Sequence, residues 1–465
     1  MNFAHSIPIR YTGLVVSGIP EFVDCAEHGD TLLGSCRNLT VCTIQESTAK
    51  DFVDTILPGV TTIEIPLGCG FEFMTTFLNG TCNAFLAYPI PELTLRKIGY
   101  TGPYKVGTKD LTRQPVSAVS RGDDPEFEDF VNWVLRALIV AEGKNITKEK
   151  ARQFPTTMLF GEAYKNMFIN ALSHAGNYGE WYESTQRCGG VSTGSTTPDA
   201  ARDPRINYYC HPRGIVNELN FGDTGLIIPM PFGGSEIDEE DFQDEAYNYY
   251  AGPFSNGTLK SIVERDYLVC GIVGERPGLG IYNTVTDEWI GLDADYCRGL
   301  AAATLFGRSD LVEFVVFDTA ELAFVGLAQG KIDIFLGAPF TIENDVKEPT
   351  TGIGFAFGPV YFYGTDTSLA LATRQDDREW SDFVKWMTIG TFYAEENNIT
   401  SSTALDMPVV NYFGITYKQA LGDMIVAVGN YGDMYQRNME TYVPRSGRNQ
   451  LNKWKTPQMN PMWEF

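Results

Sequence analysis

The sequence is poor in the residues and spacings that mark enzymes and metal sites. Only four of its 465 residues are histidine, and its nine cysteines include no Cys-x-x-Cys pair, so no metal-ligand pattern is present. GxSxG, phosphate-loop and HExxH motifs are also missing. We therefore expect a protein that is not an enzyme and uses no cofactor or metal.

Long apolar runs and an excess of basic residues are missing too. No stretch reaches the roughly 18–20 apolar residues of a membrane span, and the N-terminus lacks the apolar core of a signal peptide. Lys and Arg number 35 against 59 Asp and Glu, which gives a net charge of −24. Such a surface repels nucleic acid and anionic membranes. We expect neither a nucleic-acid partner nor a membrane span.

Cysteines and Asn-x-Ser/Thr sequons are present in numbers that favour an oxidising, secretory compartment. The missing signal peptide conflicts with this, and the conflict disappears if the chain is a processed or truncated piece of a longer one. We therefore expect a secreted, extracellular or periplasm-like glycoprotein. The sequons are Asn38, Asn79, Asn145, Asn256 and Asn398.

The stretch from residue 267 to 364 has the clearest pattern. An apolar run at Tyr267–Val273 is followed by a glycine-bearing loop and by the Ala- and Leu-rich segment Leu292–Leu305. The β-branched run Val312–Phe317, a helix at Thr319–Gln329 and a strand at Ile332–Leu336 come next. Alternating strands and helices indicate a parallel sheet with helices on its faces. Ligands of such sheets lie beyond the carboxyl ends of the strands.

This stretch resembles the first lobe of bacterial family 3 solute-binding proteins, and most closely the branch that binds general or polar L-amino acids for ABC transporters. The matching pieces are LVCGIVG, WIGLDADYCRGLAAATLFG, VEFVVF, LAQGKIDIF and FAFGPVYFYG. The resemblance implies an α/β fold with periplasmic-binding-protein type II-like lobes. It also implies a clamshell that closes on a ligand.

An internal repeat organises the chain. Residues 121–182 match residues 374–435 without a gap, at an offset of 253; Asn145-Ile-Thr matches Asn398-Ile-Thr, for example. We predict module A at 1–232, with a second lobe, closing helices and a tail. An acidic linker is expected at 233–262. Module B, at 263–465, has a first lobe, closing helices and a tail, but largely lacks a second lobe.

The tandem modules are thus incomplete, and two interpretations stay open. The second lobe of A and the first lobe of B could pair as one split clamshell. Alternatively, A lacks its own first lobe through truncation, and the two lobes form no common cleft.

Three cysteine pairs are expected. In the resemblance, Cys270 ends the first strand of module B and Cys297 lies in the following helix, and the family often has both. Cys42 and Cys82 lie in adjacent elements of module A, at a separation that a disulfide can span. Cys188 and Cys210 would close a polar loop in the tail. Cys25–Cys36 is a weaker pairing, and Cys69 remains unassigned.

The family resemblance also indicates where a ligand would bind. Glu275 and Arg276 follow the first strand of module B, and Arg276 could act as an anion clamp or be a solvated loop residue. Asn344 occupies the position of the family's arginine, whereas Phe340 and Thr341 keep the family's aromatic and hydroxyl-bearing residues. The second lobe is expected to contribute a hydroxyl-bearing turn to the ligand site. It would also contribute Tyr88, which occupies the position of the family's aspartate. The remaining candidates are Ser47 and Thr48.

Both charged anchors of the family are thus replaced, and each such loss costs on the order of 1.5–3 kcal/mol. The first hypothesis is non-enzymatic binding of a small polar, amino-acid-like ligand with altered specificity. The second is a scaffold of degenerate binding modules with a protein partner at the cell surface. A working cleft would hold convergent polar groups, whereas a scaffold would fill the cleft with side chains such as Tyr88 and Phe340.

Overall fold

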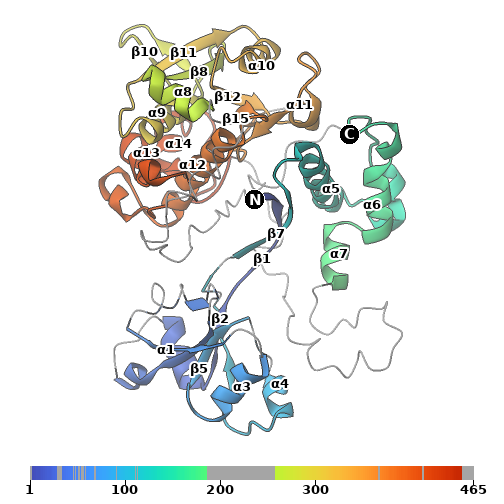
Figure 1. Cartoon of the computed structure of the whole chain (residues 1–465), viewed down its shortest axis with the longest axis vertical. Coiled ribbons are helices and arrows are strands. Elements are labelled where there is room, and N and C mark those ends of the chain that lie inside the picture. Colours follow the sequence, from blue (N-terminus) through green and yellow to red (C-terminus); the bar gives the residue numbers. More distant parts are fainter. Residues whose placement is uncertain are drawn as a thin grey trace.

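The computed structural model describes two long segments of the chain, residues 3–185 and 257–452. Short gaps within them fall at 29–33, 46, 48, 51–52, 54–56, 58, 67–69, 89, 91, 110, 113, 365–366 and 411–412. Figure 1 shows a small lobe, a long two-stranded ribbon that leaves it, and a larger α/β part beyond the ribbon.

The small lobe is built on a five-stranded sheet of order β4-β3-β5-β2-β6. Strand β3 runs parallel to both β4 and β5, whereas β2 pairs antiparallel with β5 and β6. Apolar side chains pack on both faces of this sheet, as expected when helices cover both faces. The strands are β2 (Val15–Gly18), β3 (Thr40–Ile44), β4 (Thr61–Ile65), β5 (Ala84–Ala87) and β6 (Lys105–Val106). The helical segments are α1 (Pro20–His28), η1 (Gly34–Asn38), α3 (Gly70–Leu78) and α4 (Glu92–Lys97).

The ribbon consists of β1 (Phe3–Thr12) paired antiparallel with β7 (Gln114–Arg121). Helix α5 (Pro125–Gly143) follows at once, with Asp124 as its N-cap and proline at its first position. The segment ends in further short helices. These are η2 (Lys148–Gln153), η3 (Glu162–Tyr164), α6 (Met167–Ala175) and α7 (Tyr178–Thr185).

The larger part contains a six-stranded mixed sheet of order β11-β8-β12-β15-β13, with β14 beside β15. Strand β8 is parallel to β11 and β12, whereas β15 is antiparallel to its neighbours. The strands are β8 (Leu268–Val273), β11 (Val312–Phe317), β12 (Ile334–Pro339), β13 (Phe355–Phe357), β14 (Phe362–Tyr363) and β15 (Ser368–Arg374). Its helices are α8 (Thr258–Arg265), α9 (Leu292–Thr304), α10 (Ala320–Ala328) and α11 (Ile342–Lys347), and a hairpin joins β9 (Ile281–Asn283) to β10 (Glu288–Ile290). The predicted α/β class is confirmed.

The helices that follow β15 repeat the order and boundaries of those after β7, at the same offset as the sequence repeat. The set after β15 is α12 (Arg378–Glu396), η9 (Ser401–Asp406), η10 (Ile415–Tyr417), α13 (Ala420–Val428) and α14 (Tyr431–Asn438). Asn145 and Asn398 both have a positive φ, as do Gly176 and Gly429. The two segments therefore share a local structure as well as a sequence.

Several expectations differ from the structure in detail. Between β1 and β2 the strand structure is interrupted at Gly13–Leu14, where the chain passes from the ribbon into the small lobe. Helix α8 begins at Thr258, inside the range expected to be acidic linker, because its buried Leu259 and Ile262 join the core of the larger part. The β9–β10 hairpin is absent from the sequence-based expectations.

Three disulfides are formed among the described residues. Cys42–Cys82 and Cys270–Cys297 join the pairs expected from the sequence, and Cys25–Cys36 joins the weaker one. The expected Cys188–Cys210 pair, Cys69 and the sequon Asn256 lie outside the described residues. No helix in the described ranges is long and apolar enough to cross a membrane.

Candidate functional site

Arg276 does not face an open site at the ends of the parallel strands. Its guanidinium donates to the Gly337 carbonyl oxygen at 3.1 Å and to the Asp293 carboxylate at 2.8 Å. Asp293 is fully buried and also accepts a hydrogen bond of 2.5 Å from the Tyr361 hydroxyl. Burial raises the pKa of Asp293, and Arg276 opposes that rise. Arg276 thus pairs with Asp293 and keeps a side chain that is 27% exposed, and its expected role as an anion clamp stays a prediction.

The remaining candidates of the larger part form the start of α11. The Thr341 hydroxyl is the N-cap and accepts from the Asn344 backbone N–H at 3.2 Å. The Asn344 side chain donates back to the Pro339 carbonyl oxygen at 2.8 Å. Phe340 is buried and stacks on Phe357, with 4.6 Å between ring centroids. Glu275 is exposed in its loop.

Helix α5 covers Phe340 from the other half of the chain. The rings of Trp133 and Phe340 lie edge to face at 6.0 Å, and the Arg136 guanidinium lies 5.1 Å from the Phe340 centroid. The Trp133 indole N–H donates to the Asp345 carboxylate at 2.7 Å. The position expected to face a ligand is thus part of a contact between the two described segments.

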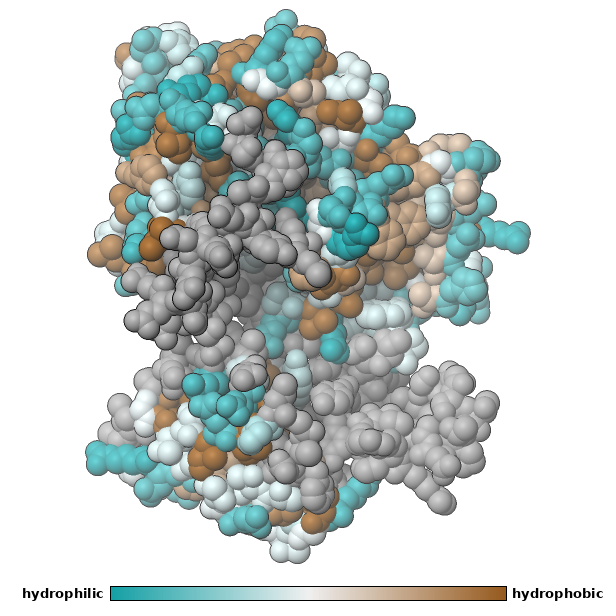
Figure 2. All heavy atoms as spheres, in the orientation of Figure 1, coloured by the Kyte–Doolittle hydropathy of each residue, from teal (hydrophilic) through white to brown (hydrophobic). Residues whose placement is uncertain are grey.

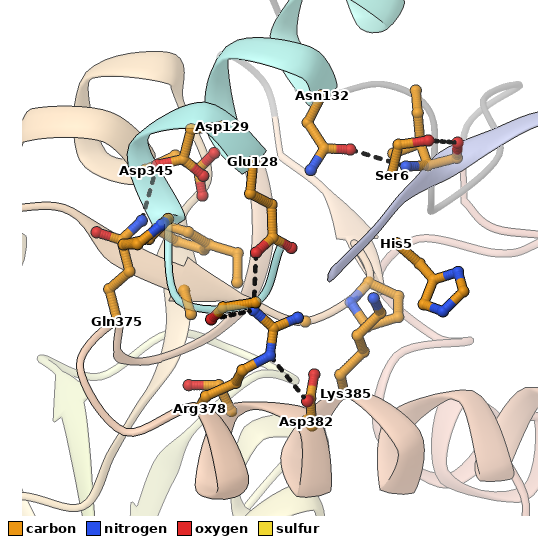
Figure 3. A pocket seen from close by; sticks show the side chains of 18 of the residues that line it. His5, Ser6, Glu128, Asp129, Asn132, Asp345, Gln375, Arg378, Asp382 and Lys385 are labelled. Carbon is orange, nitrogen blue, oxygen red and sulfur yellow. Dashed lines mark hydrogen bonds and ion pairs between the residues drawn. The ribbon is translucent and has the colours of Figure 1, made fainter. Parts of the chain in front are cut away.

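Beside this contact lies a cavity of about 370 Å³ between β1, α5, α11 and α12. Figure 3 shows its charged side chains converging from these elements, with Asp129 beside Asp345 and Glu128 facing Arg378. Its charged and polar lining residues include His5, Glu128, Asp129, Asn132, Arg136, Asp345, Gln375, Arg378, Asp382 and Lys385.

The pKa values of two acids of the cavity, Asp129 and Asp345, are raised. Burial raises the pKa of Asp345 to about 7, although Arg136 and the Trp133 N–H oppose the rise. Burial and the neighbouring Asp345 raise the pKa of Asp129 well above its usual range, and Gln375 donates to its carboxylate at 2.7 Å. Burial lowers the pKa of Arg136 to about 10. A ligand cation would stabilise the charged form of both carboxyls.

Arg378 connects the cavity wall to the ribbon and α5. It donates to the Glu128 carboxylate at 3.0 Å and to the carbonyl oxygens of Gly122 and Phe3 at 3.1 and 3.2 Å. Its Nε also lies 3.5 Å from the Asp382 carboxylate. These contacts fix the position of α12 against residues from the first described segment.

The candidates of the small lobe lie elsewhere. The Ser47 hydroxyl donates to the Ile44 carbonyl oxygen at 2.5 Å, and Tyr88 packs partly buried against the lobe core. Thr48 lies outside the described residues. In Figure 1 this lobe sits at the far end of the ribbon from α11 and α12. Among the predicted ligand residues that the structure describes, Phe340 alone lines the cavity.

Sequence reasoning missed the charged residues of the cavity. The acidic residues at 126–129 have the pattern of capping and solvated charge, yet Asp129 is buried. Arg136 could have indicated a buried polar site from the sequence, because it interrupts the apolar run of α5. A charge on such a face needs a partner. The partner, Asp345, belongs to the other described segment, so no local pattern indicates it.

Comparisons with known proteins support the sequence motifs over part of the chain. No family model matches. The amino-acid ABC transporter-binding protein YhdW of Escherichia coli (strain K12) is 31% identical over 110 residues, which cover 23% of this chain and 30% of YhdW. The general L-amino acid-binding periplasmic protein AapJ of Rhizobium johnstonii is 29% identical over 114 residues, covering 24% of this chain and 31% of AapJ.

Among solved structures, a periplasmic binding protein from Brucella ovis with glutathione bound is 20% identical. It has a TM-score of 0.34, over 40% of this chain and 92% of that one. A cysteine-binding protein from Campylobacter jejuni is 13% identical with a TM-score of 0.24, over 32% of this chain and 92% of that one. The chain spans less than a third of the length of the curated relatives named above. Over about a quarter of its length, the chain is related in sequence to the amino-acid-binding proteins of ABC transporters.

Proposed function

We propose that this chain is a non-enzymatic protein of the solute-binding type that binds a small polar, amino-acid-like ligand in the cavity beside α5. The observation that carries this proposal is the convergence of charged groups from both described segments on one cavity of about 370 Å³. Such a volume suits a small molecule. The ligand names of the curated relatives agree with this class.

The cavity offers complementary groups for the two ends of an amino acid. An ammonium group pairs best with carboxylates. Asp129 and Asp345 supply two in this cavity, of which Asp129 is buried and Asp345 half-buried. A carboxylate needs a cation, and Lys385 lines the same cavity. Acidic groups outnumber basic ones along its wall. We therefore expect amino acids with a cationic side chain to bind more tightly than acidic ones.

A thermal-shift screen of the full chain against L-amino acids tests this proposal. A ligand at a hundred times its dissociation constant should stabilise the protein by about 2.7 kcal/mol. Asp129→Asn and Asp345→Asn should each weaken binding about tenfold or more, because each removes a charge-assisted contact. Asp406→Asn is the matched control, since Asp406 is exposed on η9. Binding that survives both cavity substitutions would contradict the proposed site.

The alternative function is a scaffold, and two observations favour it. Phe340 and Arg276 are engaged in internal contacts, and the predicted ligand residues of the small lobe do not meet those of the larger part. A scaffold needs no ligand and would bind a protein partner at the cell surface. A well-folded sample with no thermal shift for any amino acid or small sugar would favour this function.

We also propose that the chain is a secreted glycoprotein built from modules A (1–232) and B (263–465), with α8 (Thr258–Arg265) leading into B. The constant offset between the two helix sets supports the modules. Asn38, Asn79, Asn145 and Asn398 are exposed, and three disulfides suit an oxidising compartment. A mass decrease on glycosidase treatment of secreted chain tests the modification.

A further inference from the structure

The two helix sets carry the same aromatic cluster in different surroundings. In α5 and η3, Phe130 lies 6.5, 5.4 and 5.3 Å from the rings of Phe127, Phe160 and Tyr164. Each ring has an aromatic counterpart at the equivalent position of the second repeat, where the cluster surrounds Phe383. The distances from Phe383 to Trp380, Phe413 and Tyr417 are 5.8, 5.0 and 5.6 Å.

The cluster around Phe383 is covered by the α/β lobe that precedes it. Trp380 is fully buried, and its indole N–H donates to the Asp333 carbonyl oxygen, just before β12, at 2.8 Å. Tyr417 stacks on Phe306, which follows α9, with 6.1 Å between centroids. The lobe of residues 258–363 therefore supplies a partner to each end of this cluster.

The cluster around Phe130 is instead open. Phe127 is 52% exposed where its counterpart Trp380 is 0% exposed, and Tyr164 is 53% exposed. Met158, two residues before the buried Phe160, is 53% exposed as well. Figure 2 shows hydrophobic residues on the surface formed by α5 and α6. Nothing within the described ranges covers these rings as the lobe covers those around Phe383.

The adjoining strands show the same difference. Strand β15 lies between β12 and β13, whereas β7 has β1 as its one strand neighbour among the described residues. The register is equivalent, because Phe3 pairs with Arg121 as Phe355 pairs with Arg374. Phe3 is 53% exposed and Phe355 0%. One edge of β15 pairs with β12. The equivalent edge of β7 pairs with no strand in the described structure.

We propose that the rings around Phe130 and the second edge of β7 form a docking surface for an α/β lobe of a partner chain, built like residues 258–363. Its strand would extend the β1–β7 ribbon as β12 extends β15, and its helical layer would cover Phe127 and Tyr164. This surface adjoins the charged cavity, but the exposed side chains that form it are not among the residues that line the cavity. The inference therefore does not depend on the proposed ligand.

The size of the surface and the rings it presents favour such a lobe over a second copy of this chain. An aromatic side chain buries about 150–250 Å², so the three half-exposed rings offer about 200–400 Å². Val119, Met158 and the strand edge add to this area, and stable interfaces bury roughly 800 Å² per partner. A second copy would bring the same uncovered rings instead of a layer that covers them. The five side chains are Phe3, Val119, Phe127, Met158 and Tyr164.

The first test uses the full chain alone. Hydrogen exchange should be at least tenfold faster in β7 than in β15, and sedimentation should give a monomer at micromolar concentration. A dimer that Val119→Lys dissociates would overturn the proposal, because a second copy would then be the occupant. Val285→Lys is the control, since Val285 is 91% exposed beside the β9–β10 hairpin.

The second test supplies a lobe. A further copy of residues 257–354 is fused to the N-terminal side of Phe3. The fusion reproduces the natural junction, in which residue 354 leads directly into Phe355. Docking should slow exchange in β7 and α5 at least tenfold, and Val119→Lys with Phe127→Asp should abolish the slowing. Thiol titration shows that the added Cys270–Cys297 pair has formed. Unchanged exchange in β7 beside a disulfide-bonded lobe would overturn the proposal.

Discussion

Asp345 and Asp129 show how burial at one contact changes the chemistry of single residues. They come from helices in different described segments. The carboxyl groups of both are desolvated where α5 meets α11. Arg136 and the Trp133 N–H compensate only part of that loss. The pair therefore keeps its protons at a pH where exposed carboxyls are charged.

This burial predicts a pH dependence of stability. The pKa of Asp345 rises from 3.8 to about 7 in the folded chain, so between these values the native state binds more protons than the unfolded state. Stability should then fall as pH rises through this window, by at most about 4 kcal/mol. Asp345→Asn keeps an acceptor for Trp133 and removes the charge.

The measurement is the unfolding temperature between pH 5 and 8. Wild type should lose stability towards pH 8, and Asp345→Asn should have a flatter profile and exceed wild type at pH 8. Asp406→Asn should follow the wild-type profile, since that carboxylate is exposed. Parallel profiles for wild type and Asp345→Asn would show that Asp345 is ionised throughout.

At the scale of elements, α5 and α12 begin in the same way but depend on their first residues differently. The Asp124 carboxylate accepts from the Phe127 N–H at 3.1 Å and is exposed. The Asp377 carboxylate accepts from the Trp380 N–H at 3.2 Å, and its second oxygen accepts from the Thr258 N–H at 2.7 Å. One residue thus caps α12 and also holds the start of α8.

We therefore predict unequal costs for the same substitution. Asp124→Ala should lower the free energy of unfolding by about 1 kcal/mol, the usual value of an N-cap. Asp377→Ala should cost about 2–3 kcal/mol, because it also removes the acceptor of the part-buried Thr258 N–H. Urea unfolding followed by circular dichroism measures both. Equal losses would mean that the α8 contact contributes nothing.

At the scale of the whole molecule, a few polar contacts hold the ribbon and α5 against the larger part. Arg378 reaches three sites on residues 3–128, and Trp133 and Arg136 hold Phe340 and Asp345. The small lobe is joined to this assembly through the β1–β7 ribbon (Figure 1). The arrangement of the parts should thus be sensitive to single substitutions.

Arg378→Ala should loosen this arrangement without unfolding either part. It removes charge-assisted hydrogen bonds that contribute about 2 kcal/mol, so the radius of gyration from small-angle X-ray scattering should increase and the ribbon should become a protease target. Arg374→Ala is the control, because Arg374 pairs with Asp376 two residues away. An unchanged scattering profile for Arg378→Ala would show that Trp133 and Arg136 suffice.

The sequence by itself determined the local structure. Apolar periodicity, caps and turn residues predicted β8, α9, β11 and α10 with nearly the observed boundaries, because those elements depend on neighbours in the chain. The internal repeat and the cysteine pairs Cys42–Cys82 and Cys270–Cys297 were also evident in sequence. The motifs pointed to the relatives that the comparisons found.

Only the tertiary structure decided which side chains meet. The contact of Trp133 with Asp345, the shared burial of Asp129, and the engagement of Arg276 by Asp293 all join residues from separate elements. No local pattern encodes such pairs, because side-chain charge and solvation depend on what packs above them. The same reason explains why the rings around Phe383 are buried and the matching rings around Phe130 are exposed.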